Sequence, residues 1–197
     1  SLNAEIVGIF SDKLAAPALQ RVPEALRWSA DPAAFADRAA FDAALADAVA
    51  TSQPAWVVCA GYMRILGQAF VQRFAGRVLN IHPSLLPKYR GLHTHRRALE
   101  AGDVEHGASV HLVVPELDAG AVIAQAGLSI LPDDTPKSLA RRLLPREHTL
   151  LVAVLRLVAG GHLTEYDGQA FLDGQPLLNP LRLDSAGLLA ASDQPSP

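Results

Sequence analysis

The chain has 197 residues, of which 50% are apolar and 19% are charged. This composition suits one folded domain with a sizeable core and excludes a disordered polyelectrolyte. The 17 Lys and Arg residues against 20 Asp and Glu residues give a formal net charge of −3. Together with a pI of about 6.1, this balance argues against a duplex nucleic-acid binder and against a basic membrane-surface protein.

The first half of the chain alternates short apolar runs with a helical pattern. Ile6–Phe10 is a β-branched run that predicts a buried strand. A helix is predicted over Ala33–Ala50, because Phe41, Leu45 and Val49 recur every four residues. The next predicted elements are a strand over Trp56–Ala60, a short helix over Gly67–Phe74 and a strand over Arg77–His82.

The second half of the chain opens with a loop. Pro83, Pro87 and Gly91 interrupt any regular pattern there. After this loop the sequence predicts a helix over Thr94–Ala101 and two strands, over Ala108–Val114 and Ala121–Ile130.

A long helix with clear end signals follows. It is predicted between Thr135, a natural N-cap, and Gly160, with a proline at its first position. Pro145 lies inside this helix and is expected to kink or break it, because proline removes one backbone hydrogen bond. After Leu163, two Asp-Gly dipeptides at 167–168 and 173–174 predict a β-hairpin, followed by a polar, mobile tail that ends in proline.

Strands that alternate with helices indicate an α/β fold with a mostly parallel sheet and helices on both faces. We assign residues 1–163 to this domain and residues 164–197 to the C-terminal hairpin and tail. Ligands of such folds bind beyond the carboxyl ends of the strands, so polar residues at those ends are the candidates for chemistry.

The single cysteine, Cys59, lies in an apolar run and cannot form an internal disulfide. We interpret it as a small buried hydrophobe, which fits a reducing cytoplasm. The longest uncharged stretch, residues 48–63, is too short for a transmembrane helix, and the first residues lack the basic region of a signal peptide. We therefore expect a cytoplasmic protein with no membrane partner.

The strongest chemical candidate is the end of the third predicted strand. Side chains alternate along a strand, so Asn80 and His82 share a face while Ile81 points to the other. An amide donor beside an imidazole can stabilise an oxyanion and move a proton. The competing interpretation is that His82 bonds to the backbone at a loop entry and Asn80 caps a turn.

Asp118 is the second candidate, in a loop between two predicted strands. Near His82, its carboxylate would favour the protonated imidazole, although an Asp before Ala-Gly is also a common turn former. Ser109 and His111 lie two residues apart on a strand and so share a face. Either they belong to the site or they form the polar edge of that strand.

The remaining histidines are weaker candidates. His93 and His95 suggest a metal site, but no Cys pair or carboxylate lies close by in the sequence, so we do not predict one. His106 and His162 are interpreted as solvated loop residues, and His148 as a packing or capping residue. The chain contains no Gly-x-Gly, which argues against a nicotinamide or nucleoside-triphosphate enzyme.

A longer motif surrounds the first candidate pair. Residues 80–91 read NIHPSLLPKYRG, which resembles the signature of formyltransferases that use 10-formyltetrahydrofolate. Within that family the continuation, LHTH at 92–95 and ALEAG at 98–102, is similar to the branch that formylates phosphoribosylglycinamide in purine biosynthesis. The further matches are AGYMRIL at 60–66, HGASVH at 106–111, ELDAG at 116–120 and Glu147-His148.

The resemblance implies a role for each matching residue. Asn80, His82 and Asp118 match the family's catalytic trio, and Ser109 and His111 match residues that support it. The resemblance assigns folate binding to Arg38, Met63, Arg64, Ile65, Leu66, Asn80, Pro115 and Asp118, and ribonucleotide binding to Glu147. It implies 10-formyltetrahydrofolate as co-substrate and no metal. It names no nucleic-acid partner and leaves the oligomeric state open.

The implied reaction is attack of the glycinamide amine on the formyl carbon, through a tetrahedral oxyanion. The family opens with a strand and a Gly-rich turn that binds the ribonucleotide phosphate. The present sequence begins at what corresponds to the second strand, so we expect the fold to lack that first strand and turn. Two other formyl-folate activities stay open, methionyl-tRNA formyltransferase and formyltetrahydrofolate deformylase. A folate-binding fragment without turnover is the third alternative.

Overall fold

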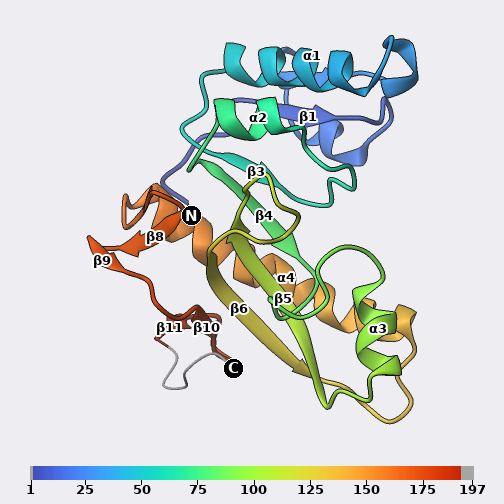
Figure 1. Cartoon of the computed structure of the whole chain (residues 1–197), viewed down its shortest axis with the longest axis vertical. Coiled ribbons are helices and arrows are strands. Elements are labelled where there is room, and N and C mark those ends of the chain that lie inside the picture. The colour runs from blue at the N-terminus through green and yellow to red at the C-terminus, as the bar shows by residue number, and fades with distance from the viewer. Residues whose placement is uncertain (1, 192–197) are drawn as a thin grey trace.

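The computed structural model describes residues 2–191 and folds them into four α-helices and eleven strands (Figure 1). The helices are α1 (Arg38–Thr51), α2 (Gln68–Arg73), α3 (Thr94–Glu100) and α4 (Pro136–Ala159). The strands are β1 (Ile9–Ser11), β2 (Arg27–Ser29), β3 (Val57–Cys59), β4 (Val78–His82), β5 (Glu105–Leu112), β6 (Val122–Ser129), β7 (Leu163–Tyr166), β8 (Gln169–Leu172), β9 (Gln175–Pro176), β10 (Leu181–Leu183) and β11 (Leu189–Ala190). Short 3-10 helices at Pro17–Arg21, Glu24–Leu26 and Pro32–Ala34 connect the N-terminal elements.

Six strands form the central sheet, in the order β11-β10-β6-β5-β4-β3. β3 pairs parallel with β4, and β10 pairs parallel with β6. β5 lies antiparallel between β4 and β6, and β11 is antiparallel to β10. Hence β3, β4, β6 and β10 run one way, and β5 and β11 run against them. The predicted α/β fold with a mostly parallel sheet is confirmed, while the reversal at β5 was not predicted.

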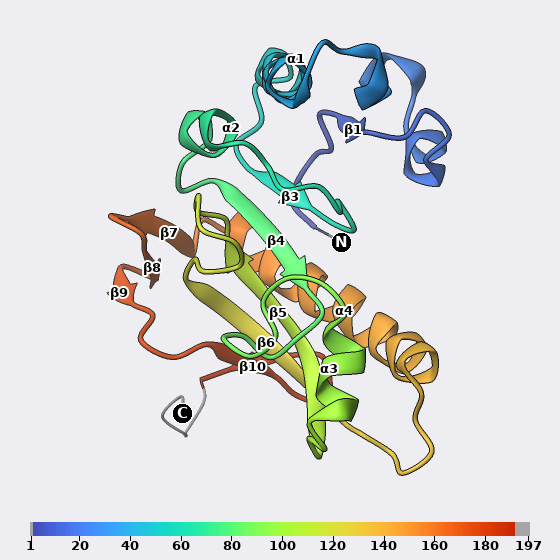
Figure 2. The ribbon, with the colours of Figure 1, turned by 45° about the vertical axis from the view of Figure 1, so that its right-hand side comes forward.

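Helices cover both faces of this sheet, as successive residues of β4 demonstrate. Leu79 belongs to the core between the sheet and α4, with Leu143 and Leu150 of that helix. Its neighbour Val78 belongs to a second core with Phe41 of α1 and Phe70 of α2. Because successive strand residues point to opposite faces, α4 lies on one face and α1 with α2 on the other (Figure 2).

Helix α4 has the predicted ends but not the predicted break. The Thr135 side chain accepts a hydrogen bond from the Ser138 amide and the Ser138 hydroxyl accepts one from the Thr135 amide, which forms a capping box. The helix ends at Gly160 and runs unbroken across Pro145. Of the expected kink or break at this proline, the break was therefore wrong, and the kink stays a prediction. Leu143 and Leu150 are buried in the core against the sheet, and Leu139 is also fully buried, so buried side chains stabilise the helix on both sides of Pro145.

The N-terminal region forms a separate small unit of sheet. β1 pairs parallel with β2, a strand that the sequence analysis did not predict, and neither strand joins the central sheet. Trp28 packs between Phe10 and Phe41, with ring centroids 6.4 and 6.1 Å away. This aromatic row fastens the small sheet to α1, which lies above β1 in Figure 1. Ile6 is 60% exposed, so the buried strand expected over Ile6–Phe10 was wrong at its start.

The C-terminal part contains the predicted hairpin and then returns to the central sheet. β7 and β8 pair antiparallel, and β9 adds a third strand. β10 then lies beside β6, with Leu181 and Leu183 buried in the main core. The Pro-ending tail at residues 192–197 lies outside the described residues. Among residues 2–191, no helix is long and apolar enough to span a bilayer.

Candidate active site

Neighbouring strands bring four polar side chains to one face of the sheet at the carboxyl end of β4. In the antiparallel register of β4 and β5, Asn80 lies opposite His111, and His82 lies opposite Ser109. Opposed residues share a face, as do residues two apart, so all four side chains project together. Ile81 turns the other way and packs against the core under α4. The predicted grouping of Asn80 with His82 on one face is therefore confirmed.

His82 is 6% exposed and has an oxygen acceptor at each ring nitrogen. Its Nε2 lies 2.9 Å from the backbone oxygen of Tyr89, and its Nδ1 lies 3.4 Å from Oδ2 of Asp118. The carbonyl oxygen can only accept, so Nε2 of His82 donates to it, and the Asp118 carboxylate lies on the opposite side of the ring.

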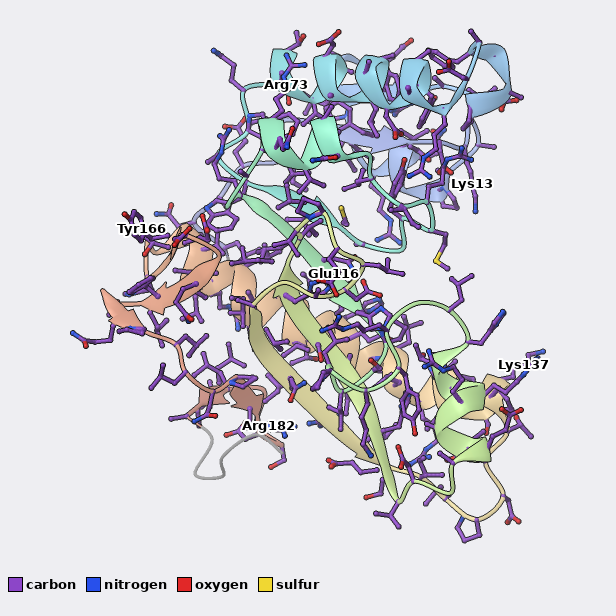
Figure 3. The ribbon with its side chains drawn as sticks, viewed as in Figure 1. Lys13, Arg73, Glu116, Lys137, Tyr166 and Arg182 are labelled. Atoms are coloured by element: carbon purple, nitrogen blue, oxygen red, sulfur yellow. The ribbon has the colours of Figure 1, made fainter. Side chains whose placement is uncertain are left out.

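Asp118 reaches His82 from the loop between β5 and β6, with a left-handed backbone (φ 48°). Its Oδ2 accepts a hydrogen bond of 2.8 Å from the Gly91 amide, on the loop that follows β4. The same two loops are joined by Arg90 Nη1 and Glu116 Oε1 at 2.9 Å; Figure 3 labels Glu116 above the sheet. The carboxylate predicted from the sequence is therefore placed beside the imidazole, and its position is set by both loops.

Asn80 is oriented by a chain of hydrogen bonds through His111. Nδ1 of His111 lies 2.8 Å from the backbone oxygen of Leu112, so it carries the proton and donates. Burial lowers the pKa of His111, which leaves its Nε2 as an acceptor. The Asn80 amide nitrogen lies 3.1 Å from that Nε2 and donates to it. One N–H of Asn80 is thus used by His111, and the second can serve a ligand.

The cluster unites three chemical functions in one place. Asn80 supplies a neutral N–H donor, His82 an imidazole that can donate and carry a proton, and Asp118 a carboxylate acceptor. Two donors held beside one another can stabilise a developing oxyanion, and the His82–Asp118 pair can carry a proton. This arrangement suits a reaction that passes through a tetrahedral oxyanion.

The loop between β3 and α2 borders the same end of the sheet. β3 pairs with β4 so that Cys59 lies beside Asn80, and the loop 60–67 continues from there. Met63 is 69% exposed and Ile65 is 52% exposed, so the loop presents apolar side chains to solvent. Arg38 Nη2 donates to the backbone oxygen of Ile65, which places its cation at the loop.

Two further sequence candidates lie on the loop between β5 and β6 and on α4. Pro115 is exposed in the loop between β5 and β6. Glu147 is half-buried on α4, and burial raises the pKa of its carboxyl. Among the described residues, no hydrogen bond or ion pair joins Glu147 to Asn80, His82 or Asp118.

Three further histidines, His93, His95 and His106, lie on or beside α3 and β5. His93 is exposed at the start of α3, with a left-handed backbone. His95 packs edge-on against His106 at 4.9 Å between ring centroids. His106 is 1% exposed on β5, so its interpretation as a solvated loop residue was wrong. Burial lowers the pKa of His106 to about 4. Within residues 2–191, no three His, Cys, Asp or Glu side chains are grouped to hold a metal ion.

Sequence reasoning missed several groups that hold the site. Tyr89 and Gly91 act through their backbone, which residue types do not reveal. Gln125 and Ser84 are buried side chains that bond to the loop after β4. One signal was available: Gln125 is a polar residue inside the apolar strand β6, and buried polar groups require partners.

Comparison with known proteins gives consistent matches. The family model described as "Formyl transferase" matches residues 1–155. The chain is 44% identical over 178 residues to the phosphoribosylglycinamide formyltransferase of Escherichia coli, which covers 89% of this chain and 84% of that protein.

Solved structures agree with these matches. The phosphoribosylglycinamide formyltransferase of Coxiella burnetii superposes with a TM-score of 0.80 at 46% identity, covering 88% of this chain and 82% of that chain. A formyltetrahydrofolate deformylase of Pseudomonas syringae superposes with a TM-score of 0.76 at 27% identity, covering 87% of this chain but 57% of that chain.

Proposed function

The chain belongs to the formyl transferase family, and from this premise we propose that it is a phosphoribosylglycinamide formyltransferase. It transfers the formyl group of 10-formyltetrahydrofolate to the amine of 5′-phosphoribosylglycinamide, a step of purine biosynthesis. The observation that carries this proposal is the grouping of Asn80, His82 and Asp118 at the carboxyl end of β4. The relatives with this name match most of both chains, whereas the deformylase is matched over 57% of its length.

The reaction exchanges one carbon–nitrogen bond for another. The glycinamide nitrogen attacks the formyl carbon, a new C–N bond forms, and the carbonyl electrons move onto oxygen. The free N–H of Asn80 and the cationic ring of His82 stabilise that oxyanion. When the oxyanion collapses, the bond between the formyl carbon and the folate nitrogen breaks.

Proton transfer completes the exchange. The attacking amine loses one proton and the departing folate nitrogen gains one, so the net reaction needs no oxidant or external base. Asp118 is 3.4 Å from His82 Nδ1, which suits it to hold the imidazolium and to pass the proton, directly or through a water. His111 keeps the Asn80 amide oriented throughout, because its Nε2 accepts from that amide.

The substrates are assigned to the surroundings of the trio. We assign the folate ring to the loop of Met63, Arg64, Ile65 and Leu66, because the exposed apolar side chains of that loop can cover an apolar ring. Arg38 lies at that loop and suits a carboxylate of the folate. Pro115, on the loop that carries Asp118, is assigned to the folate as well, and the carboxylate of Glu147 suits hydroxyl donors of the ribonucleotide. We expect a cytoplasmic enzyme that acts on small molecules.

The test is a formyl-transfer assay with both substrates, followed by the absorbance of the freed folate. We expect turnover by the chain and a loss of kcat of at least about 100-fold in Asn80→Ala and in His82→Ala. His162→Ala is the matched control, because His162 pairs with Asp173 at the surface. Near-native turnover in either active-site variant would contradict the assignment. Release of formate without the ribonucleotide would instead indicate a deformylase.

A further inference from the structure

A closed hydrogen-bond network lies under the loop that follows β4. The Ser109 hydroxyl donates to the backbone oxygen of Ser84 at 2.7 Å. It accepts from the Leu86 amide at 3.0 Å and from Nε2 of Gln125 at 3.0 Å. A hydroxyl has one donor and two acceptor positions, so Ser109 is fully satisfied. Ser84, Ser109 and Gln125 are all buried, so water does not substitute for these bonds.

Gln125 completes this network from the next strand. Its Nε2 also donates to the backbone oxygen of Leu86 at 2.8 Å, so both amide protons are used. The register places Gln125 opposite Ser109, and Ser109 opposite His82. The three side chains therefore form one row across β6, β5 and β4, on the face that carries the trio.

The network ends at the imidazole of the trio. The Ser84 hydroxyl donates to the backbone oxygen of Lys88 at 2.6 Å, which ties down the far half of the loop. The next residue, Tyr89, presents its backbone oxygen to Nε2 of His82. The acceptor that holds this ring nitrogen therefore depends on a loop whose inner side is anchored by Gln125 and Ser109.

We propose that Gln125 is a positioning residue for formyl transfer, which acts on His82 through the loop 83–89. Without its amide, the buried Leu86 oxygen loses its side-chain donor and the loop gains freedom to shift. The Tyr89 oxygen then no longer holds Nε2, and the productive ring orientation becomes less populated. The Tyr89 hydroxyl is anchored separately on Asp103 at 2.8 Å, so the effect is partial rather than complete.

The kinetic test compares Gln125 with a second glutamine that also donates two hydrogen bonds through Nε2. Gln169 donates to the backbone oxygens of Ala170 and Leu177, and it lies in the C-terminal hairpin. We expect Gln125→Leu to lower kcat by about 10- to 100-fold, with both KM values within about twofold. Gln169→Leu should retain kcat within about twofold. Equal kcat values for the two folded variants would overturn the proposal.

A second variant covers the case in which Gln125→Leu does not fold. Gln125→Glu keeps the shape of the side chain, but the ionised carboxylate cannot donate to the Leu86 oxygen. Its kcat relative to the unmodified chain is therefore expected to rise as the pH falls and the introduced carboxyl takes up a proton. A ratio of one at every pH would contradict the role of Gln125 as a donor.

Because this inference rests on the proposed function, one measurement uses no substrate. The ¹⁵N resonance of His82 Nε2, identified by its loss in His82→Ala, reports the hydrogen bond to Tyr89. We expect it to shift in Gln125→Leu or Gln125→Glu and to stay unchanged in Gln169→Leu. A shift without turnover in any chain would refute the proposed function alone. An unchanged resonance in a folded Gln125 variant would refute the positioning role.

Discussion

The Asp118 carboxylate provides the sharpest test of how the trio works. Asp118→Asn preserves the size of the side chain and, through its amide oxygen, an acceptor for the Gly91 amide. It removes the negative charge that lies 3.4 Å from Nδ1 of His82. The substitution therefore changes the electrostatics of the pair and leaves the loop anchored.

The expected loss of kcat follows from the distance between His82 and Asp118. Two unit charges 3.4 Å apart attract by about 5 kcal/mol at an effective dielectric constant of about 20. Only the part of this attraction that grows toward the transition state affects the rate. Taking about half, 2–3 kcal/mol, we expect kcat to fall by roughly 30- to 160-fold.

The assay is steady-state formyl transfer, with unfolding in urea as a check on the fold. Asp173→Asn is the matched control, because Asp173 pairs with His162 on the exposed surface. We expect the control to stay within about twofold of the unmodified chain. If Asp118→Asn also stays within threefold, the charge of Asp118 does not act on the transition state and the reasoning fails.

Two further predictions concern stability. Burial lowers the pKa of His106 to about 4, whereas the unfolded chain binds a proton near pH 6.5, so acid favours unfolding. As the pH falls from 6.5 to 4, we expect the free energy of unfolding of the chain, measured in urea, to decrease by about 2 kcal/mol more than that of His106→Phe. Parallel pH profiles of the two proteins would show that His106 is not the cause. Thr135→Ala removes the acceptor for the Ser138 amide, and we expect about 1 kcal/mol lower stability with unchanged kcat. An unchanged urea midpoint would show that the cap contributes nothing.

Local patterns were enough to predict the helices and most of the central strands. The four-residue spacing of Phe41, Leu45 and Val49 marks the buried face of α1, and Thr135 with Gly160 marks the ends of α4. A helix boundary differs from the predicted one where a side chain caps the helix. Helix α1 begins at Arg38 because the Asp37 side chain accepts from the Ala40 amide. Such signals lie within a few residues of the element they define, so the sequence exposes them.

Elements defined by distant partners were not predictable in the same way. β2 is three residues long and exists through its pairing with β1, and β10 exists through its pairing with β6. The reversal of β5 leaves no mark in the sequence, because a buried strand is apolar in either direction. Pro145 has the residue type that breaks helices, yet the buried leucines on both sides of it keep α4 continuous.

The same distinction between local patterns and distant partners applies to the candidate site. The sequence by itself determined which groups are present: an amide and an imidazole on one strand face, a carboxylate in a later loop, and the motif of a formyl transferase. Only the tertiary structure decided that Asp118 meets His82, that His111 orients Asn80, and that a carbonyl of Tyr89 and the amide of Gln125 belong to the same assembly. The physical reason is that residue type sets what a group can donate or accept, whereas the register of β4, β5 and β6 sets which groups are within reach of one another.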